Sequence, residues 1–410
     1  MKYRPCLLLS ADVCIPASTV ARCGMVALLW GTLMGGTLHA ERPATYWSSM
    51  TGDFYDFSNW HLGAPGATLD GRIDNGGIAQ ITYPVEQTIP YVYLGSQQYT
   101  AGTLEISGEG VANFTTMIVG ALNATGTLKI TSGGQLTSFG GPIGSDYLGV
   151  GYALVDGAGS SWKLTGSEMV IGGNGTGNLL VQNSGSFTVA NGNGRIQLGN
   201  HPVSEGNLYI GNGGAAGTFN ANEIYNGEGR GTVTFNHSDP AYAFAPKFTG
   251  LKTVNGYLNV LHNGPGTTIL TAVESNLAGT VTVAAGTLIV NGKIMGSVRE
   301  ALEENEVEEL VIVQEKTIGE TLVQMGGTLG GSGFLEGKTT VQGKLSPGMG
   351  GLGVLKFGGD LSLESTGTVT MELGGELRGV QFDGLDVAGA LLYGGTLNIV
   401  LLNGFEPETG

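Results

Sequence analysis

The chain has 410 residues, of which 74 are glycine and 13 are proline, and only 13% are charged. The glycine share is more than twice the ordinary one. Because glycine is unfavourable inside helices, this argues against a helical protein and for many short strands separated by turns. Glycine follows no strict period of three, which excludes collagen. The net charge of −16 disfavours nucleic acid and anionic membranes as partners, since both need a basic surface.

The first forty residues have the pattern of a secretory signal peptide. Basic residues precede an apolar run at 25–38, which is too short for a membrane span, and Ala40 suits the position before a cleavage site. All three cysteines lie in this segment, so the exported chain would hold no disulfide and no thiolate metal site. We therefore predict that residues 1–40 are a signal peptide. The alternative is an uncleaved amphipathic or buried segment.

A five-residue pattern recurs along the rest of the chain: Gly, Thr or Asn, Leu or Val, any residue, then Ile, Val or Phe. Early copies are spaced by about one or two multiples of 25 residues, which is typical of a solenoid. The two apolar positions of each copy share one face of a strand, and stacked coils about 4.8 Å apart can bury that face. Copies start at Gly102, Gly126, Gly177, Gly206, Gly231, Gly286 and Gly395.

The predicted fold is therefore all-β, a right-handed parallel β-helix of roughly a dozen coils with Gly and Asn at its corners. The competing all-β folds are a stack of sandwiches and a propeller, although the period is short for a propeller blade. We also expect corner asparagines to form hydrogen-bonded ladders, namely Asn178, Asn183, Asn207 and Asn212.

Two segments depart from the repeat. Aromatic residues gather near the start of the exported chain, including Trp47, Phe54 and Trp60, which predicts an N-terminal cap; a glycan-binding platform is the alternative. Six glutamates fall between 300 and 309 among apolar residues at helical spacing, which predicts a short acidic helix or loop insertion. The predicted order is signal peptide 1–40, aromatic cap region 41–90, β-helix repeats 91–297, acidic insertion 298–315 and further repeats 316–410.

The phrase Val155-Asp-Gly-Ala-Gly-Ser-Ser-Trp162, followed by Ser184-Gly-Ser-Phe-Thr-Val189, resembles the repeat shared by autotransporter (type V secretion) passengers and PEP-CTERM-sorted bacterial proteins. Gly327-Thr-Leu-Gly-Gly-Ser-Gly333 and Phe382-Asp-Gly-Leu-Asp-Val387 are similar to autotransporter-associated β-strand repeats.

The resemblance implies an exported β-helix, extracellular or on the outer surface of a Gram-negative-type bacterium. Its role would be adhesion or envelope or matrix display, and its partners host or matrix glycans or proteins. Such families carry a C-terminal translocating barrel or a terminal Pro-Glu-Pro sorting motif. Neither is found before Gly410, so we expect residues 316–410 to be the truncated end of a longer repeat array.

The sequence predicts a non-enzymatic protein with no catalytic residue, cofactor or metal site. The histidines beyond the leader are far apart along the chain, and no His-Glu-x-x-His pattern or cysteine pair exists. The alternative is a polysaccharide lyase or hydrolase on the same fold, which needs carboxylates converging in one groove. Glu205, Glu228 and Arg230 are offset by about one coil and are the candidates. Trp162 is either a sugar-stacking residue or, as we favour, a packing residue.

Overall fold

The computed structural model describes residues 6–8, 14–16, 42–253, 255–304 and 310–407. They fall into two units, residues 1–43 and 44–410, and each is described by itself. In the first unit, β1 (Cys6–Leu8) pairs antiparallel with β2 (Cys14–Pro16). The apolar run at 25–38 and Ala40, on which the signal-peptide prediction rests, lie outside the described residues.

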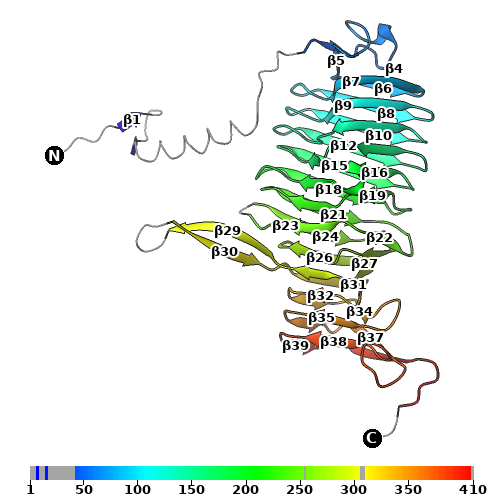
Figure 1. Ribbon diagram of the computed structural model, residues 1–410, viewed down its shortest axis with the longest axis vertical. Helices are drawn as coiled ribbons and strands as arrows, with labels where there is room; N and C mark the ends of the chain where they lie inside the picture. Colours follow the sequence, from blue (N-terminus) through cyan, green and yellow to red (C-terminus); the bar gives the residue numbers. More distant parts are fainter. Residues whose placement is uncertain (1–5, 9–13, 17–41, 254, 305–309, 408–410) are drawn as a thin grey trace, which may run out of the picture. The chain divides into compact units, whose positions relative to one another are not determined.

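The second unit is a parallel β-solenoid of about 13 turns, so the predicted parallel β-helix is confirmed. Each strand pairs in parallel with the equivalent strand one turn later, and Figure 1 shows these turns stacked from the blue to the red end of the unit. Stacking satisfies the backbone N–H and C=O groups of each turn with those of its neighbours. The strands form four ladders, named A to D below.

Ladder A holds β3 (Ala44–Tyr46), β5 (Asp70–Ile73), β7 (Pro84–Leu94), β9 (Val111–Val119), β11 (Gln135–Gly140), β13 (Ser161–Leu164), β16 (Ser186–Val189) and β19 (Thr218–Asn220). Ladder B holds β14 (Glu168–Ile171), β17 (Arg195–Leu198), β20 (Glu223–Asn226), β23 (Lys247–Gly250), β26 (Glu274–Leu277), β28 (Lys293–Met295), β32 (Phe334–Leu335), β35 (Val354–Phe357) and β38 (Gly384–Val387).

Ladder C holds β4 (Thr51–Asp53), β6 (Asn75–Ile81), β8 (Ala101–Ser107), β10 (Thr125–Thr131), β12 (Val150–Asp156), β15 (Thr176–Gln182), β18 (Glu205–Ile210), β21 (Arg230–Phe235), β24 (Tyr257–His262), β27 (Val281–Val290), β31 (Thr321–Gly331), β33 (Thr339–Val341), β36 (Leu361–Leu363) and β39 (Leu391–Tyr393). Ladder D holds β22 (Tyr242–Phe244), β25 (Thr267–Leu270), the second halves of β27 and β31, β34 (Lys344–Pro347), β37 (Thr368–Leu373) and β40 (Thr396–Leu401). Two single 3-10 turns, η1 (Phe57–Asn59) and η2 (Ala190–Gly192), are the helical segments in the described part of the chain.

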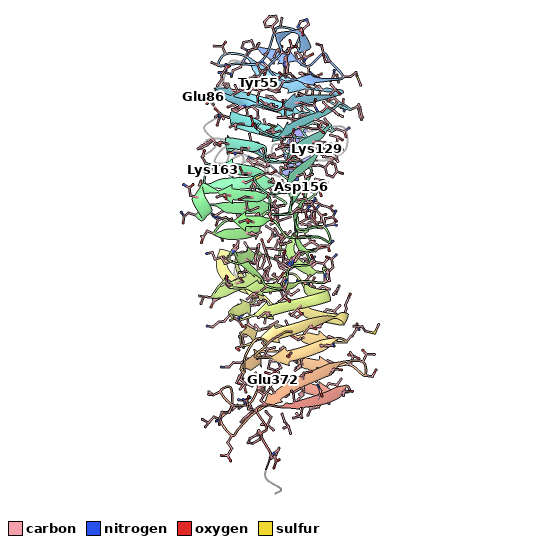
Figure 2. The ribbon with its side chains drawn as sticks, turned by 90° about the vertical axis from the view of Figure 1, so that its right-hand side faces the viewer. Tyr55, Glu86, Lys129, Asp156, Lys163 and Glu372 are labelled. Carbon is pink, nitrogen blue, oxygen red and sulfur yellow. The ribbon has the colours of Figure 1, made fainter. Side chains whose placement is uncertain are left out.

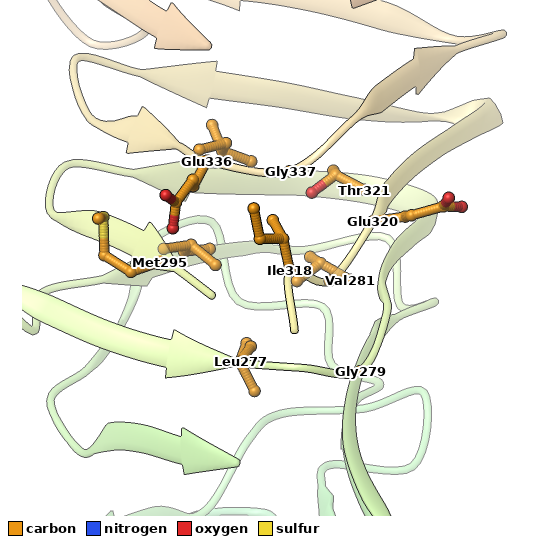
Figure 3. A pocket seen from close by; sticks show the side chains of 12 residues that line it. Leu277, Gly279, Val281, Met295, Ile318, Glu320, Thr321, Glu336 and Gly337 are labelled. Atoms are coloured by element: carbon orange, nitrogen blue, oxygen red, sulfur yellow. The ribbon is translucent and has the colours of Figure 1, made fainter. Parts of the chain in front are cut away.

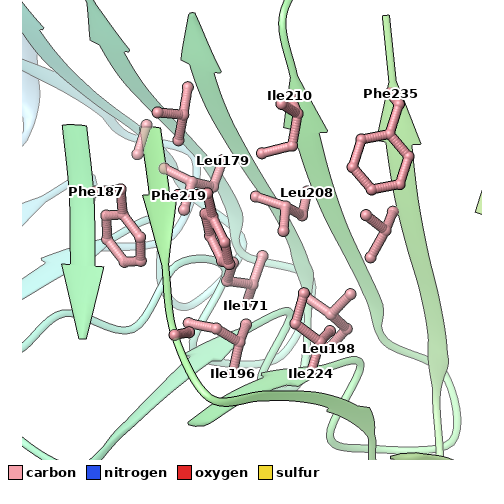
Figure 4. Close-up of a cluster of buried hydrophobic side chains, with 14 of the residues drawn as sticks. Ile171, Leu179, Phe187, Ile196, Leu198, Leu208, Ile210, Phe219, Ile224 and Phe235 are labelled. Carbon is pink, nitrogen blue, oxygen red and sulfur yellow. The ribbon is translucent and has the colours of Figure 1, made fainter. Parts of the chain in front are cut away.

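The five-residue repeats stack in the register that the sequence predicted. Gly102 lies opposite Gly126, and Gly177 lies opposite Gly206, so equivalent residues of successive copies form columns. The inward columns are fully buried, as at Leu179 and Leu208, and Figure 4 shows such side chains meeting inside the solenoid. The alternation of buried and half-buried residues along each ladder C strand follows from the two-residue period of a strand.

The structure also reveals a copy that the sequence pattern missed. The offset between the copies at Gly126 and Gly177 spans two turns, and β12 fills the turn between them. Gly151 there pairs with both glycines, but Tyr152 and Ala153 stand where other copies have Thr or Asn and then Leu or Val.

Glycine at the corners is required by backbone geometry as well as by contact. Gly172 has φ of 76°, and a Cβ atom there would lie 2.2 Å from the carbonyl oxygen of Glu205 on the next turn. Gly120 has φ of 75° and would place a Cβ 2.1 Å from the carbonyl oxygen of Val150. Only a residue without a side chain fits such a corner, which explains much of the glycine content.

Aromatic rings form a continuous stack inside the middle turns, in which Trp162 meets Phe187 edge to face and the following rings are parallel. Trp162, Phe187 and Phe219 are register partners in ladder A, with ring centroids 5.4 and 5.6 Å apart. Phe244 continues the stack at 5.9 Å from Phe219. Trp162 is only 1% exposed and its indole N–H donates to Ser138 Oγ at 3.0 Å. It is therefore a packing residue and is not available to stack on a sugar.

A second aromatic cluster lies in the first turns of the solenoid. Trp60 contacts Trp47 and Phe54 edge to face, with centroids 5.1 and 5.2 Å apart, and its indole N–H donates to the Phe54 carbonyl. All three rings are at most 4% exposed, so they pack the end of the core and are not available to a glycan, whereas Tyr46 and Phe57 of the same segment are 40% and 72% exposed. The parallel pairing already begins at β3, so this segment builds the first turns itself.

The predicted acidic helix at 298–310 is wrong, because this segment begins an antiparallel hairpin of β29 (Ser297–Glu304) and β30 (Leu310–Thr317). Residues 305–309 lie outside the described part. The physical reason is the following segment, Leu310-Val-Ile-Val, whose β-branched residues favour a strand and supply a partner for the glutamate-rich one. The predicted excursion itself is present: Figure 1 shows the hairpin extending away from the stacked turns.

Candidate interaction surface

The carboxylates proposed for an enzyme do not converge. Glu205 and Arg230 are register partners on β18 and β21, as their one-turn offset predicted, and form an ion pair at 3.3 Å. Both side chains are about half exposed. Glu228 is exposed in the turn before β21, and among the described residues no hydrogen bond or ion pair joins its carboxylate to either side chain. Arg230 therefore pairs with the carboxylate of Glu205 and does not bring the carboxylates of Glu205 and Glu228 together.

Ladder B carries charges of alternating sign in one column. Glu168 pairs in register with Arg195, Arg195 with Glu223, and Glu223 with Lys247. Arg195 lies 3.3 Å from a Glu223 oxygen and stacks 4.2 Å from the centroid of Tyr225, whose hydroxyl donates to Glu168. Burial and this carboxylate neighbour raise the pKa of Tyr225. The column therefore contains two acidic and two basic residues in alternation, whose charges balance.

Two histidines lie inside the solenoid. His237 and His262 are fully buried, with ring centroids 5.8 Å apart. His237 Nε2 is 2.8 Å from Thr268 Oγ1, and His262 Nδ1 is 2.8 Å from the Ala285 carbonyl oxygen, so both rings have polar partners in the core. Burial lowers the pKa of both, that of His262 to about 4, and both are neutral at pH 7. Among the described residues, no three His, Cys, Asp or Glu side chains are grouped to hold a metal ion.

A mainly apolar surface lies on the outward face of ladder C. Leu154, Leu180 and Tyr209 form one outward column on β12, β15 and β18, and Tyr152 flanks it on the first of these turns. In the two preceding turns this column holds Glu105 and Lys129, which are charged. We name the set Tyr152, Leu154, Asn178, Leu180, Asn207 and Tyr209 the tyrosine surface.

All members of the tyrosine surface except Asn207 line a shallow depression of about 350 Å³, whose lining also includes Thr127 and Lys129. Tyr152 is 48% exposed, and Leu154, Leu180 and Tyr209 are half-buried. Burial raises the pKa of Tyr209, and the Tyr152 hydroxyl and the Glu205 carboxylate add to this effect. Lys129 and Asp156, on β10 and β12 beside it, are labelled in Figure 2.

Amide side chains form a polar column next to the apolar one. Asn207 Nδ2 donates to Asn178 Oδ1 at 3.2 Å, and Asn178 Nδ2 donates to the Gly151 carbonyl at 3.2 Å. The expected asparagine ladder is thus present at these two positions, although they lie within strands and not at corners. Each NH₂ group uses one of its two hydrogens in these bonds, so each retains a donor for a ligand.

The two cations that border the tyrosine surface, Lys129 and Arg230, are each paired with a glutamate. Lys129 Nζ lies 2.9 Å from Glu105, which also accepts a hydrogen bond from Gln80. These bonds lower the pKa of Glu105, so it is ionised at neutral pH. On the other side, Glu205 is paired with Arg230. Both cations are therefore balanced by carboxylates, and Asp156, whose carboxylate oxygen accepts a hydrogen bond from Asn183, adds a negative charge.

Other hollows differ in character. The crevice in Figure 3, at the base of the hairpin between Ile318 and Leu277, measures about 10 Å³, enough for a single water. A surface groove of about 460 Å³ on ladder B is lined by Lys293, Phe334 and Lys356, but Lys293 lies 3.8 Å from Glu274, which offsets its charge. The ladder B groove has one ring, Phe334, and one amide, Asn291, whereas the tyrosine surface has two rings and two amides.

Sequence reasoning missed the tyrosine surface, although a signal was present. Once the copy at Gly151 is aligned with its neighbours, the position three residues after the glycine is apolar in three consecutive turns, at Leu154, Leu180 and Tyr209. Outward positions of a solenoid strand are ordinarily polar, so such a run is the mark of a surface that contacts something.

Comparison with known proteins gives two distant relatives, and no family model matches the chain. It is similar to "Adhesin BmaC autotransporter" of Brucella suis biovar 1 (strain 1330), with 29% identity over 275 residues. This match covers 64% of the chain and 7% of that protein. It is also similar to "Uncharacterized protein YuaQ" of Escherichia coli (strain K12), with 28% identity over 225 residues, 53% of the chain and 15% of that protein.

The chain thus spans a small part of the length of the curated relatives that it matches. Similarity to an autotransporter together with the β-solenoid fits an autotransporter passenger, whereas the PEP-CTERM resemblance stays a prediction. Over the described residues, no helix combines the length and hydrophobicity needed to cross a membrane.

Proposed function

We propose that this chain is part of the surface-displayed solenoid of an adhesin-like autotransporter passenger, a non-enzymatic protein. The observation that carries the proposal is the tyrosine surface, an exposed aromatic and apolar patch on the outward face of a regular solenoid. Such patches on otherwise polar surfaces mark sites of interaction. The similarity to an autotransporter adhesin supports the same role.

The fold suits display at a distance from a cell. Each turn advances the axis by the strand spacing of about 4.8 Å, so about 13 turns reach roughly 60 Å. Turns contact their neighbours through ladders that satisfy the backbone, which gives a stiff rod without disulfides. The expected location is the outer surface of a Gram-negative-type bacterium, and the expected partners are host or matrix glycans or proteins.

The proposal is tested by displaying the full chain on Escherichia coli, with a heterologous autotransporter β-barrel fused after residue 410. We expect more cells to attach to epithelial monolayers and matrix-coated plates than cells that display an unrelated solenoid. A Tyr152→Ser/Tyr209→Ser double variant should lose this gain. Tyr147→Ser is the matched control, because Tyr147 is 66% exposed and lies outside the tyrosine surface.

Display must be equal in all strains, measured by an antibody to the solenoid and by its release with added protease. Attachment at the level of the unrelated solenoid, with equal display, would refute the adhesin role.

A further inference from the structure

We propose that the tyrosine surface binds an uncharged glycan, with sugar rings against Tyr152 and Tyr209 and hydroxyl groups on Asn178 and Asn207. This inference rests on the proposed function, because it names the ligand class of the same surface. Its basis is the combination of rings, amides and paired cations at one depression.

The apolar component matches one face of a sugar ring. A pyranose presents C–H groups on its faces and hydroxyl groups around its rim. The C–H faces pack against aromatic rings and aliphatic side chains, and hydrogen bonds contribute little to this packing. Tyr152 and Tyr209 lie on strands separated by β15, so they stand about 10 Å apart along the axis, with Leu180 between them. That spacing lets two rings of one extended oligosaccharide, with one sugar unit between them, contact the two tyrosines.

The polar component matches the rim of the same sugar. Asn178 and Asn207 are joined to each other and to the Gly151 carbonyl, so their orientations are fixed before a ligand arrives. Each keeps one N–H hydrogen for a sugar hydroxyl, and Asn207 Oδ1 can accept a second bond. Few, well-placed polar groups beside apolar contacts are the usual make-up of a small-molecule site.

Local charge selects against acidic glycans. A uronate or sialate would need an unpaired cation, but Lys129 is engaged by Glu105 and Arg230 by Glu205. The net charge of −16 also repels anions at long range. An uncharged glycan needs no cation and is not repelled by the net charge of the chain.

The size of the surface favours a glycan over a protein partner. A stable protein interface buries about 800 Å² on each side around an apolar core. The apolar part here consists of four side chains. The column to which Tyr152 belongs continues with polar residues, Asn178, Asn207 and Thr232. The area is that of a short oligosaccharide. A site this shallow binds weakly, at about millimolar Kd, and many displayed copies supply the avidity.

The experiment uses the purified full chain, titrated with cellohexaose and mannohexaose as neutral probes and hexagalacturonate as the acidic one. Binding is followed by saturation-transfer NMR and calorimetry. We expect a neutral probe to bind. Tyr209→Ser and Tyr152→Ser should each weaken it by about three- to tenfold, the loss typical of an aromatic contact, while Tyr147→Ser leaves it unchanged. Circular dichroism establishes that each variant remains folded.

Glu105→Gln provides a test in the opposite direction. It frees Lys129 of its partner and should raise affinity for hexagalacturonate several-fold, while binding of the neutral probe stays within twofold, about the error of a weak titration.

Three results would overturn the inference: no binding of either neutral probe at about 10 mM, equal losses in the Tyr147→Ser control, or preference of the wild type for hexagalacturonate. The display assay separates this failure from that of the adhesin role. Attachment that needs Tyr152 and Tyr209 but resists excess neutral glycan indicates a protein ligand, which refutes the glycan inference and leaves the proposed function standing.

Discussion

Removing one ring from the aromatic stack tests whether the solenoid is stabilised locally, turn by turn. Phe187 is fully buried between Trp162 and Phe219, at centroid distances of 5.4 and 5.6 Å. Phe187→Ala deletes the ring and leaves a cavity that rigid ladders on both sides cannot close. The expected loss in the free energy of unfolding is about 3–5 kcal/mol.

The loss should be local, because each turn of a solenoid contacts only its neighbours. A destabilisation of about 3 kcal/mol corresponds to about a hundredfold change in an opening equilibrium. Hydrogen exchange of the backbone amides in β13, β16 and β19 should therefore accelerate by about that factor. Amides in β34 and β37, many turns away, should change little.

The assay is hydrogen exchange read by mass spectrometry, together with urea unfolding followed by circular dichroism. Phe139→Ala is the matched control, since the Phe139 ring is 62% exposed, and it should cost less than about 0.5 kcal/mol. Equal effects of the two variants would contradict the buried stack. Uniform acceleration along the whole solenoid would contradict turn-by-turn stability.

Three further perturbations test other features. Gly172→Ala should lower the free energy of unfolding by more than about 2 kcal/mol, because the left-handed backbone is strained and the new Cβ overlaps the Glu205 carbonyl. Gly213, at φ of 87°, has open space around it, so Gly213→Ala should cost only the strain. Equal thermal midpoints for the two variants would refute the overlap. The folded-state pKa of His262 is about 4, below its unfolded value of 6.5, so its stabilising contribution is complete above pH 6.5 and is lost as pH falls towards 4. Wild-type stability in urea should fall by up to about 3 kcal/mol over that range and less in His262→Gln; an identical pH dependence would refute the role of this imidazole. Arg195→Gln should lower the free energy of unfolding by less than about 1 kcal/mol, and the difference should shrink in 1 M salt. A larger loss that does not depend on salt would mean that the ladder B column does more than balance exposed charge.

The solenoid could be predicted because its determinants are local and repeated. A strand with Leu104 and Ile106 on one face, and with Gly102 close against the Ile73 carbonyl, carries the inward pattern in five residues. Where a copy departed from the pattern, as at Tyr152 and Ala153, its turn was passed over although its backbone pairs normally. The hairpin was misread as helical because its strand character depends on the pairing of Ser297–Glu304 with Leu310–Thr317, which a window on one segment does not contain.

The candidate site was harder to predict than the fold because it depends on residues brought together across turns. The one-turn offset of Glu205 and Arg230 is visible in the sequence, and in the structure these two residues form an ion pair. Trp60 and Trp162, which the sequence offered as possible ligand-binding rings, are buried. The sequence analysis did not single out Tyr209. Exposure, not residue type, separates the two groups, and exposure follows from the position within the strand.

This division between inward and outward positions also makes the tyrosine surface separable from the fold. Inward residues such as Leu179 and Leu208 hold the turns together, and outward residues contribute little to the ladder pairing, which the backbone supplies. Thr127 and Thr232 occupy the same outward column as Tyr152 in nearby turns of ladder C, so the architecture accommodates a small polar residue there. Replacing Tyr152 and Tyr209 by serine should therefore leave the solenoid folded and remove only its exposed rings. Loss of binding without loss of structure would then be attributable to the surface itself.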